Sequence, residues 1–189
     1  MLTDQSKYSQ PIATITIVVA IFIIDQLTKI LAIYFLQPYQ SVPVLGNFFR
    51  LTYVENPGMA FGIEVPNKIL LNVLSIFAAG IIFYYLFLLR DHLFLRITFA
   101  TILGGAFGNL TDRFLRGKVV DFIDLEFFDI NFSGISFFWW KIPRFSLYRW
   151  PVFNVADIAV TIGMTIVILT AFLNYPIQVT VNDTANKTP

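Results

Sequence analysis

The sequence contains no cysteine and only one histidine among its 189 residues. Without a thiol it has no disulfide, no thiolate nucleophile and no zinc-thiolate site, so cysteine catalysis is excluded. The one histidine, His92, lies in "RDHLFLR" between two apolar runs. We interpret it as a loop residue rather than as the base of a serine-histidine-aspartate relay, and metal sites built from several histidines are excluded.

Charge is also scarce, because only 13% of the residues are charged and the net charge is +1. No basic surface for nucleic acid is indicated, and we expect no nucleic-acid partner. By contrast, 57% of the residues are hydrophobic and the mean hydropathy is +0.71. These values are far above what one soluble core needs, so the composition predicts a membrane protein.

Four apolar segments approach the length of about 20 residues that a membrane-spanning helix needs. They are residues 11–36, 69–89, 97–114 and 152–173. We expect the first to stay as an anchor, since no small-x-small cleavage site follows it. The connections 37–68 and 115–151 are long and lie on the same side of the membrane. The chain, residues 1–189, is thus predicted to be a single-domain polytopic α-helical membrane protein with four transmembrane helices.

The two long connections carry different patterns. In the first, "NFFRLTYVEN" alternates large and polar side chains, which predicts a strand over Asn47–Asn56 that ends in the turn "NPG". In the second, aromatic residues mix with bases in a composition typical of the membrane interface. These residues are Trp139, Trp140, Lys141, Arg144, Tyr148, Arg149 and Trp150. Either an aromatic belt at the membrane surface or a lid over a ligand fits this composition.

Ionisable residues interrupt the apolar segments. Each costs about 2.5–3.5 kcal/mol at the centre of a spanning helix, so each is a hypothesis of function. In "DQLTK", Asp25 and Lys29 stand at i and i+4 with the acid first, which is the favourable order for an ion pair on one helix face. A purely structural pair is as consistent with this spacing as direct chemistry.

The third apolar segment ends in "GGAFGNLTDRFLRG". Here Gly105, Asn109 and Arg113 fall on one stripe by their i, i+4 spacing and are predicted to face the same neighbour. The fixed donors of Arg113 suit a carbonyl or phosphate group at the membrane surface. Pairing with Asp112 or another acid is the alternative for this arginine.

Two further stretches carry acids near the predicted membrane edge. In "VVDFIDL", Asp121 and Asp124 are surrounded by branched and aromatic residues, so partial desolvation is expected to raise their pKa values. In "FNVADIAVTIG", Asn154 and Asp157 have the spacing of a helix-capping box. Two carboxyl groups brought close together cannot both ionise, so one donates a proton while the other activates water. The chain can therefore assemble an aspartic-protease pair from Asp121 and Asp157.

Five ordered boxes carry a family resemblance over about residues 20–173. They read "DQLTK", "ENPGMAFG", "GGAFGNLTDR", "VVDFIDL" and "FNVADIAVTIG". Each box is weak alone, but all five in this order are specific. With them the chain resembles the lipoprotein signal peptidase (signal peptidase II) family of bacterial membrane aspartyl endopeptidases.

The resemblance implies an activity and a set of residues. The activity is removal of the signal peptide from diacylglyceryl-modified prolipoproteins on the amino side of the lipidated cysteine, without a metal or other cofactor. The implied catalytic residues are Asp121 and Asp157. The implied supporting residues are Asp25, Lys29, Asn56, Gly58, Gly105, Asn109, Arg113 and Asn154. Lipidated prolipoprotein, membrane phospholipid and the cyclic peptide inhibitor globomycin are the implied partners.

The resemblance also implies an orientation in the bacterial cytoplasmic (inner) membrane, with both termini cytoplasmic and the site near the outer face. The long connections then form a small extracytoplasmic β-rich cradle and a longer extracytoplasmic loop between helices 3 and 4. A count of lysines and arginines favours the opposite orientation, because bases are more frequent on the side of the long connections.

The chain departs from the family pattern at two places. The loop "NPGMAF" has Pro57 and Met59 where other small or polar residues are expected. The connection between Asp121 and Asp157 is longer than expected, which suggests a flap around Phe137–Trp150 that lies on the membrane and covers the substrate.

A small transporter or proton-conducting protein is the alternative function, because it would also keep acids within the membrane. Such a relay needs ionisable groups near the midplanes of several helices. Here most of the polar boxes fall near one face of the predicted bundle, as a surface-accessible hydrolase requires.

Overall fold

The computed structural model describes residues 5–58, 67–89, 92–127 and 130–173. Its helices are α1 (Gln5–Leu36), α2 (Lys68–Leu88), α3 (Leu93–Leu115) and α4 (Val155–Phe172). Within these residues, four helices are long and apolar enough to cross a membrane, which confirms the predicted four-span architecture. Met59 and the three residues that follow it in its box, Ala60, Phe61 and Gly62, lie outside the described residues.

The start of α3 differs from the prediction. The helix begins at Leu93 rather than at residue 97, so the connection before it is shorter than predicted and His92 is the residue that precedes the first turn. The apolar side chain of Leu95 and the long side chain of Arg96 are both buried. Packing of this first turn therefore extends the helix beyond the uninterrupted apolar run that the sequence displays.

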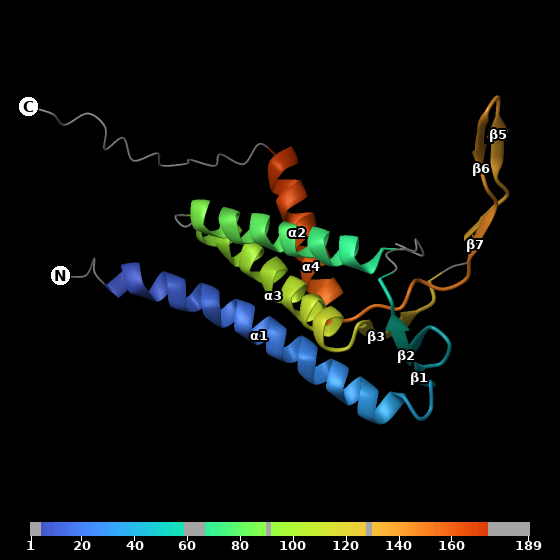
Figure 1. The fold of residues 1–189 in the computed structure, drawn as a ribbon, viewed down its shortest axis with the longest axis horizontal. Coiled ribbons are helices and arrows are strands. Elements are labelled where there is room, and N and C mark those ends of the chain that lie inside the picture. The colour runs from blue at the N-terminus through green and yellow to red at the C-terminus, as the bar shows by residue number, and fades with distance from the viewer. Residues whose placement is uncertain (1–4, 59–66, 90–91, 128–129, 174–189) are drawn as a thin grey trace, which may run out of the picture.

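Helix α3 lies at the centre of the bundle and packs against α1, α2 and α4 (Figure 1). More than half of the most apolar stretch of α3 is buried inside the protein, whereas 17% or less of the corresponding stretch is buried in each of the other three helices. The large apolar side chains of these outer helices are exposed, among them Ile30, Phe77 and Leu169. In a membrane this exposed apolar surface faces lipid.

Glycines in α3 allow the neighbouring helices to approach its backbone. A Cβ atom on Gly105 would lie 2.6 Å from the carbonyl oxygen of Ala156 in α4. A Cβ atom on Gly104 would lie 2.9 Å from the carbonyl oxygen of Val18 in α1. Since real Cβ atoms do not approach so closely, the contacts of α3 with α1 and α4 depend on these small residues.

A three-stranded antiparallel sheet lies at one end of the bundle. Its strands, in the order β1 (Ser41–Leu45), β2 (Phe49–Asn56) and β3 (Val119–Leu125), join the two long connections. Strand β2 confirms the strand predicted from alternation, and Gly58, with φ of +121°, completes the turn after it. The sequence did not predict β1 or β3.

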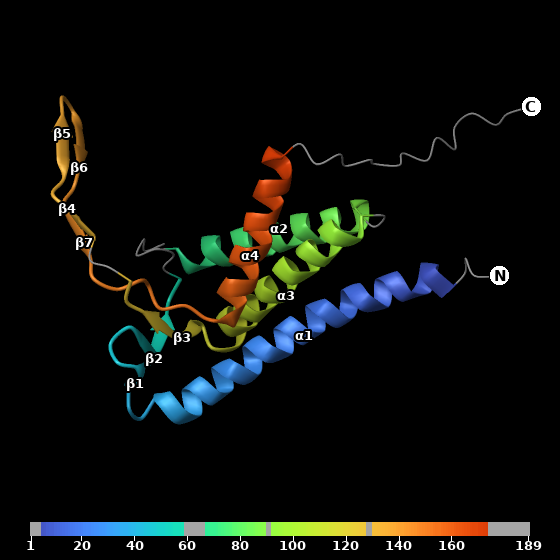
Figure 2. The same ribbon diagram turned by 180° about the vertical axis from the view of Figure 1, so that it is seen from behind.

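The second long connection is not simply a loop. After β3 it forms two hairpins, in which β4 (Ile130–Phe132) pairs with β7 (Phe145–Leu147) and β5 (Ile135–Phe137) pairs with β6 (Trp140–Ile142). The hairpins follow one another in a single narrow ribbon that projects from the sheet end of the molecule (Figure 2). The chain then returns to the bundle and enters α4.

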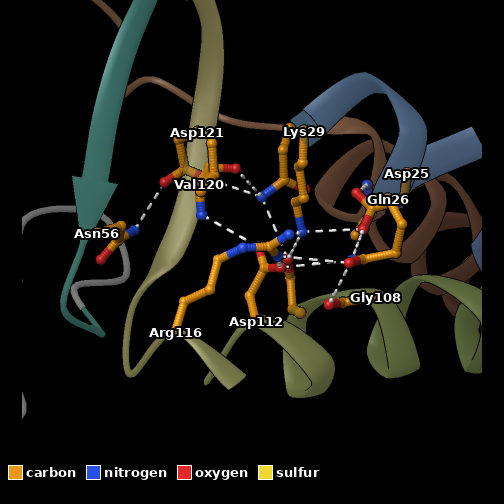
Figure 3. Close-up of polar contacts among 12 residues, drawn as sticks. Asp25, Gln26, Lys29, Asn56, Gly108, Asp112, Arg116, Val120 and Asp121 are labelled. Atoms are coloured by element: carbon orange, nitrogen blue, oxygen red, sulfur yellow. Dashed lines mark hydrogen bonds and ion pairs between the residues drawn. The ribbon is translucent and has the colours of Figure 1, made fainter. Parts of the chain in front are cut away.

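A buried ion-pair network ties the helices to one another beneath the sheet. The Nζ atom of Lys29 lies 2.9 Å from Oδ2 of Asp25 and 3.1 Å from Oδ2 of Asp112, and all three side chains are fully buried. Figure 3 shows Lys29 between these two acids, with Arg116 on the far side of Asp112. Lys29 and Arg116 thus balance the charges of the two carboxylates.

The same acids also bind backbone groups of other elements. Oδ1 of Asp25 accepts a hydrogen bond from the N–H of Ala156 at 2.9 Å, which joins α1 to α4. Oδ2 of Asp112 accepts one from the N–H of Val120 at 3.1 Å, which joins α3 to β3. The network therefore fixes two helices and one strand relative to α1.

Loss of the Lys29 charge should destabilise the protein far more than loss of a surface lysine. Lys29→Met leaves Asp25 and Asp112 buried without their shared cation, and we expect a loss of about 3–5 kcal/mol of unfolding free energy. Lys118→Met is the matched control, because its ion pair with Glu55 is about half exposed at 46% and 42% and should contribute about 1 kcal/mol or less. Unfolding in detergent micelles measures both, and equal losses would contradict the prediction.

Candidate functional site

Asp121 lies in β3 and is only 1% exposed. Its Oδ2 atom accepts a hydrogen bond from Nδ2 of Asn56 at 2.9 Å, and its Oδ1 atom accepts one from Nδ2 of Asn154 at 2.6 Å. The amide of Asn56 is itself oriented, because its Oδ1 atom accepts the N–H of Gly58 at 2.9 Å. The turn after β2 therefore directs an amide donor at this carboxyl group.

Asp157 lies in the first turn of α4 and forms a capping box with Asn154, as the sequence predicted. The N–H of Asp157 donates to Oδ1 of Asn154 at 3.0 Å, and the N–H of Asn154 donates to Oδ2 of Asp157 at 3.1 Å. The other carboxylate oxygen, Oδ1, accepts a hydrogen bond from Nδ2 of Asn109 at 2.8 Å. Both oxygens of Asp157 are thus held by amide donors.

Asn154 connects the two acids. It is fully buried, and its side chain donates to Asp121 while its oxygen and its backbone N–H engage Asp157. Its position follows from the preceding residue, because Phe153 pairs with Ile123 of β3 through hydrogen bonds of 2.8 and 3.0 Å. The chain therefore extends the sheet by one bridge and turns directly into α4, which brings Asp157 beside Asp121.

The charges of the two acids interact. Burial first, and the charge of Asp157 second, raise the pKa of Asp121 from 3.8 to about 7, while hydrogen bonds from Asn56 and Asn154 oppose the shift. The carboxyl group of Asp121 therefore keeps its proton to a higher pH than an ordinary aspartate does. This is the arrangement expected of two carboxyl groups that share one proton.

Asn109 connects this pair to the buried ion network. Its Oδ1 atom accepts hydrogen bonds from Nζ of Lys29 at 2.8 Å and from Nδ2 of Asn154 at 3.2 Å. With its oxygen occupied in this way, the amide can direct only its NH₂ group at Asp157. Lys29 thus acts on Asp157 through one intervening side chain.

Arg113 lies near the two acids. Within the part of the chain that the structure describes, it makes no hydrogen bond to either carboxyl group. Its Nη1 atom donates to Oγ of Ser75 in α2 at 3.1 Å, and its buried Nε atom has no hydrogen-bond partner. Its charge interacts with Asp157 more than with any other carboxylate. Asp112, the acid named as an alternative partner of Arg113, forms its ion pairs with Lys29 and Arg116.

The structure gathers most of the residues singled out in the sequence. One chain of hydrogen bonds joins Asp25, Lys29, Asn109, Asp157, Asn154, Asp121, Asn56 and Gly58. Gly105 lies one turn before Asn109, where α3 touches α4. Asp112 and Arg116 were missed as members of the network, although their i, i+3 and i, i+7 spacing from Asn109 was a signal that they share its helix face.

Asp124 is separate from this site. Its Oδ2 atom accepts a hydrogen bond from Oγ1 of Thr52 at 2.6 Å, and its Oδ1 atom pairs with Nε of Arg149 at 2.7 Å. Arg149 also donates to the carbonyl oxygen of Asn47 at 3.0 Å. Asp124 therefore fastens the base of the hairpin ribbon to the sheet.

An apolar groove of about 230 Å³ lies between α1 and the sheet. It is lined by Thr28, Leu31, Ala32, Phe35, Leu36, Leu51 and Phe122. Phe122 follows Asp121 in β3, so the two side chains lie on opposite faces of the strand and the groove does not open onto the acids. In the described part of the chain, no cluster of three or more acidic or histidine side chains is arranged to hold a metal ion.

Comparison with known proteins identifies relatives over most of the chain. A family model described as "Signal peptidase (SPase) II" matches residues 17–173. A lipoprotein signal peptidase of Moorella thermoacetica is 41% identical over 145 residues, which are 76% of this chain and 81% of the relative. A lipoprotein signal peptidase of Chlorobium phaeovibrioides is 42% identical over 149 residues, which are 77% of this chain and 82% of the relative.

Two solved structures have the same fold. One, titled "Bacterial membrane enzyme structure by the in meso method at 2.3 A resolution", superposes with a TM-score of 0.66 at 28% identity and covers 94% of both chains. A second with the same title at 1.9 Å resolution gives a TM-score of 0.64 at 27% identity and covers 87% of this chain and 94% of the other. By its sequence and by its fold, the chain belongs to the signal peptidase II family.

Proposed function

We propose that this protein is a membrane aspartic endopeptidase that removes signal peptides from prolipoproteins, with Asp121 and Asp157 as its catalytic pair. Membership of the signal peptidase II family supports the reaction. The observation that carries the assignment of the pair is the buried Asn154, which contacts both carboxyl groups at the junction of β3 and α4. We propose that residues 1–189 act as one peptidase unit.

The environments of the two acids support a division of roles. Asp157, in the first turn of α4, is the general base and takes a proton from a bound water, because Asp121, with its raised pKa, is the better proton donor of the two. The water oxygen attacks the carbonyl carbon of the scissile peptide bond. Protonated Asp121 donates a hydrogen bond to the developing oxyanion and then gives its proton to the leaving amino group. The water supplies the hydroxyl group of the new carboxyl end, Asp157 accepts its proton, and Asp121 supplies the proton of the leaving amino group. The step therefore balances without a metal or other cofactor.

The remaining polar residues position the pair and the substrate. Asn56, Asn109 and Asn154 hold the carboxyl oxygens, and Arg113 offers its unpartnered Nε atom to a backbone carbonyl or a lipid headgroup. The expected cleavage site is the amino side of a cysteine that carries diacylglycerol, whose acyl chains enter from the lipid between the apolar helix faces. Globomycin is the expected inhibitor of this step.

Transport or proton conduction is not favoured. The buried acids Asp25, Asp112 and Asp121 lie together at the sheet end of the bundle (Figure 3). Asp25 and Asp112 are neutralised by Lys29 and Arg116, so neither is available as a separate station of a proton relay.

Removing either acid of the pair should abolish turnover while leaving the fold intact. We expect Asp121→Asn and Asp157→Asn to lower kcat by about 10²–10⁴-fold, the usual contribution of general acid or base catalysis. The measurement is cleavage of a lipidated prolipoprotein peptide in detergent. Asp124→Asn is the control, because Asp124 is buried in the same strand but binds Thr52 and Arg149 instead.

The control separates loss of chemistry from loss of structure. Asp124→Asn should lower the unfolding midpoint and keep most of the cleavage rate. Normal cleavage by Asp121→Asn or Asp157→Asn would overturn the assignment of the pair, as would an Asp124→Asn protein that is folded but as inactive as they are.

Activity should fall as the pH rises through about 7, because Asp121 then loses the proton that it donates. Since the hydrogen bond from Asn56 lowers the pKa of Asp121, Asn56→Ala should move this alkaline limb of kcat/KM to higher pH. A pH profile of peptide cleavage for both proteins tests this. A limb that stays at the same pH in Asn56→Ala would contradict the role given to Asp121.

The same proton affects stability in a defined direction. Because the pKa of Asp121 is higher in the folded protein than its ordinary 3.8, ionisation of this group destabilises the fold increasingly as the pH rises from about 3.8 to about 7. The contribution is absent in Asp121→Asn. The unfolding midpoint of that variant, relative to the unchanged protein, should therefore rise with pH across this window.

We also propose that the chain lies in the bacterial inner membrane with the sheet outside and both termini in the cytoplasm. The chain has no cysteine of its own, so single cysteines report position without interference. In spheroplasts, a membrane-impermeant maleimide should label Asn47→Cys at the sheet end and spare Leu173→Cys at the far end of α4. Labelling of Leu173→Cys alone would reverse the orientation.

A further inference from the structure

The hairpin ribbon β4–β7 has no role in the site described above. Among the described residues, its strands pair with one another and make no extensive contact with any helix or with the three-stranded sheet. A two-stranded hairpin alone is at best marginally stable in water. The ribbon therefore needs a surface to lie on.

The register of the hairpins sorts apolar from polar positions. Across β5 and β6, Ile135 pairs with Ile142 and Phe137 with Trp140, while Ser136 pairs with Lys141. Paired positions share one face of a ribbon and alternate positions lie on opposite faces. The backbone thus places an apolar row on one face of the hairpin and a polar row on the other.

The same arrangement repeats in β4 and β7. There Ile130 pairs with Leu147 and Phe132 with Phe145, while Asn131 pairs with Ser146. Both hairpins are therefore amphipathic along their whole length. An amphipathic element of this kind is typical of a surface between water and lipid.

The tip of the ribbon is aromatic and exposed. Phe138 and Trp139 are 79% and 84% exposed, with ring centroids 5.6 Å apart. Both lie outside the four membrane spans, so the lipid-facing surface of the bundle does not account for their exposure. Phe138 also has a φ of +52°, which a bulky residue rarely adopts and a glycine would adopt without strain.

Charge and position indicate which surface the ribbon meets. Residues 130–148 contain the bases Lys141 and Arg144 and no acid, which suits the anionic headgroups of a bilayer. In Figures 1 and 2 the ribbon leaves the sheet end of the bundle and runs across the direction of α1 and α3. Relative to α1 and α3, this direction suits a segment that extends along the membrane surface.

We propose that the ribbon is a membrane-surface anchor whose tip, Phe138 and Trp139, inserts into the headgroup layer of the bilayer that holds the helices. The base of the ribbon is fixed to the sheet by the N–H of Trp150, which donates to the carbonyl oxygen of Leu125 at 2.9 Å, and by the Asp124–Arg149 pair. The anchor thus holds the sheet end of the protein at a set depth. It does not depend on the proposed catalytic roles.

Intrinsic fluorescence tests this directly, because two of the three tryptophans of the protein, Trp139 and Trp140, lie in the ribbon and the third, Trp150, lies at its base. The full chain with Trp140→Phe and Trp150→Phe, which keeps only Trp139, is placed in nanodiscs of phosphatidylcholine and phosphatidylglycerol. We expect phosphatidylcholine brominated near the glycerol end of its acyl chains to quench the fluorescence of Trp139 strongly. We expect acrylamide to quench Trp139 several-fold less than it quenches free N-acetyltryptophanamide. Phe107→Trp as the only tryptophan, on the exposed face of α3, is the positive control.

Two variants test whether the apolar tip makes the contact. Phe138→Gly with Ile135→Ser suits the turn and removes exposed apolar groups, so Trp139 should lose most of its bromolipid quenching and become open to acrylamide. Ser136→Asn, a change in the polar row, should leave both signals unchanged. In nanodiscs without phosphatidylglycerol, brominated lipid should quench Trp139 less than in nanodiscs that contain it. Equal quenching in the two kinds of disc would overturn the role given to Lys141 and Arg144.

Three results would overturn the anchor. The first is that acrylamide quenches Trp139 as fully as it quenches free N-acetyltryptophanamide, while brominated lipid has no effect on Trp139. The second is unchanged bromolipid quenching in Phe138→Gly/Ile135→Ser. The third is protection from acrylamide that appears only after a lipidated signal-peptide fragment is added, since the ribbon would then cover substrate rather than bind the bilayer.

Discussion

The ammonium group of Lys29, buried between Asp25 and Asp112, is the interaction on which the site depends. An ammonium group has three N–H donors, and here each has an acceptor: the two carboxylates and the amide oxygen of Asn109. Because the ammonium group is fully buried, these three acceptors are what compensate its charge, so their geometry is fixed. The ion pair that joins α1 to α3 therefore also decides which end of Asn109 meets Asp157.

The two acids of the pair reach the site by different routes, and their surroundings differ accordingly. Asp121 comes from a buried strand, where desolvation raises its pKa to about 7. Asp157 comes from the first turn of a helix, where its two oxygens accept hydrogen bonds from the Asn109 amide and from the backbone N–H of Asn154. Unlike environments are what allow two identical side chains to act as acid and base. The fold thus supports the division of roles before any substrate binds.

Features that depend on local pattern could be predicted from the sequence. Apolar length gave the four spans, alternation gave β2, and the spacing of Asn154 and Asp157 gave the capping box. Strand β3 could not be predicted, because burial on both of its faces removes the alternation that marks a strand. The ribbon strands have three residues each, too few to show a period. The bond from Lys29 to Asn109 joins residues 80 positions apart and requires the packed helices.

The place of the ribbon in the chain explains how the protein accommodates it. It lies between Asp121 and Asp157 in sequence, yet Trp150 returns to Leu125, and Phe153 returns to Ile123, by backbone hydrogen bonds at its base. Because these hydrogen bonds fix both ends of the segment, its length does not change the positions of Asn154 and Asp157. The entropy cost of closing a loop also grows only slowly with the number of residues in it. An inserted segment at this point can therefore acquire a membrane contact of its own while the spacing of the two acids stays set by the sheet and by the cap of α4.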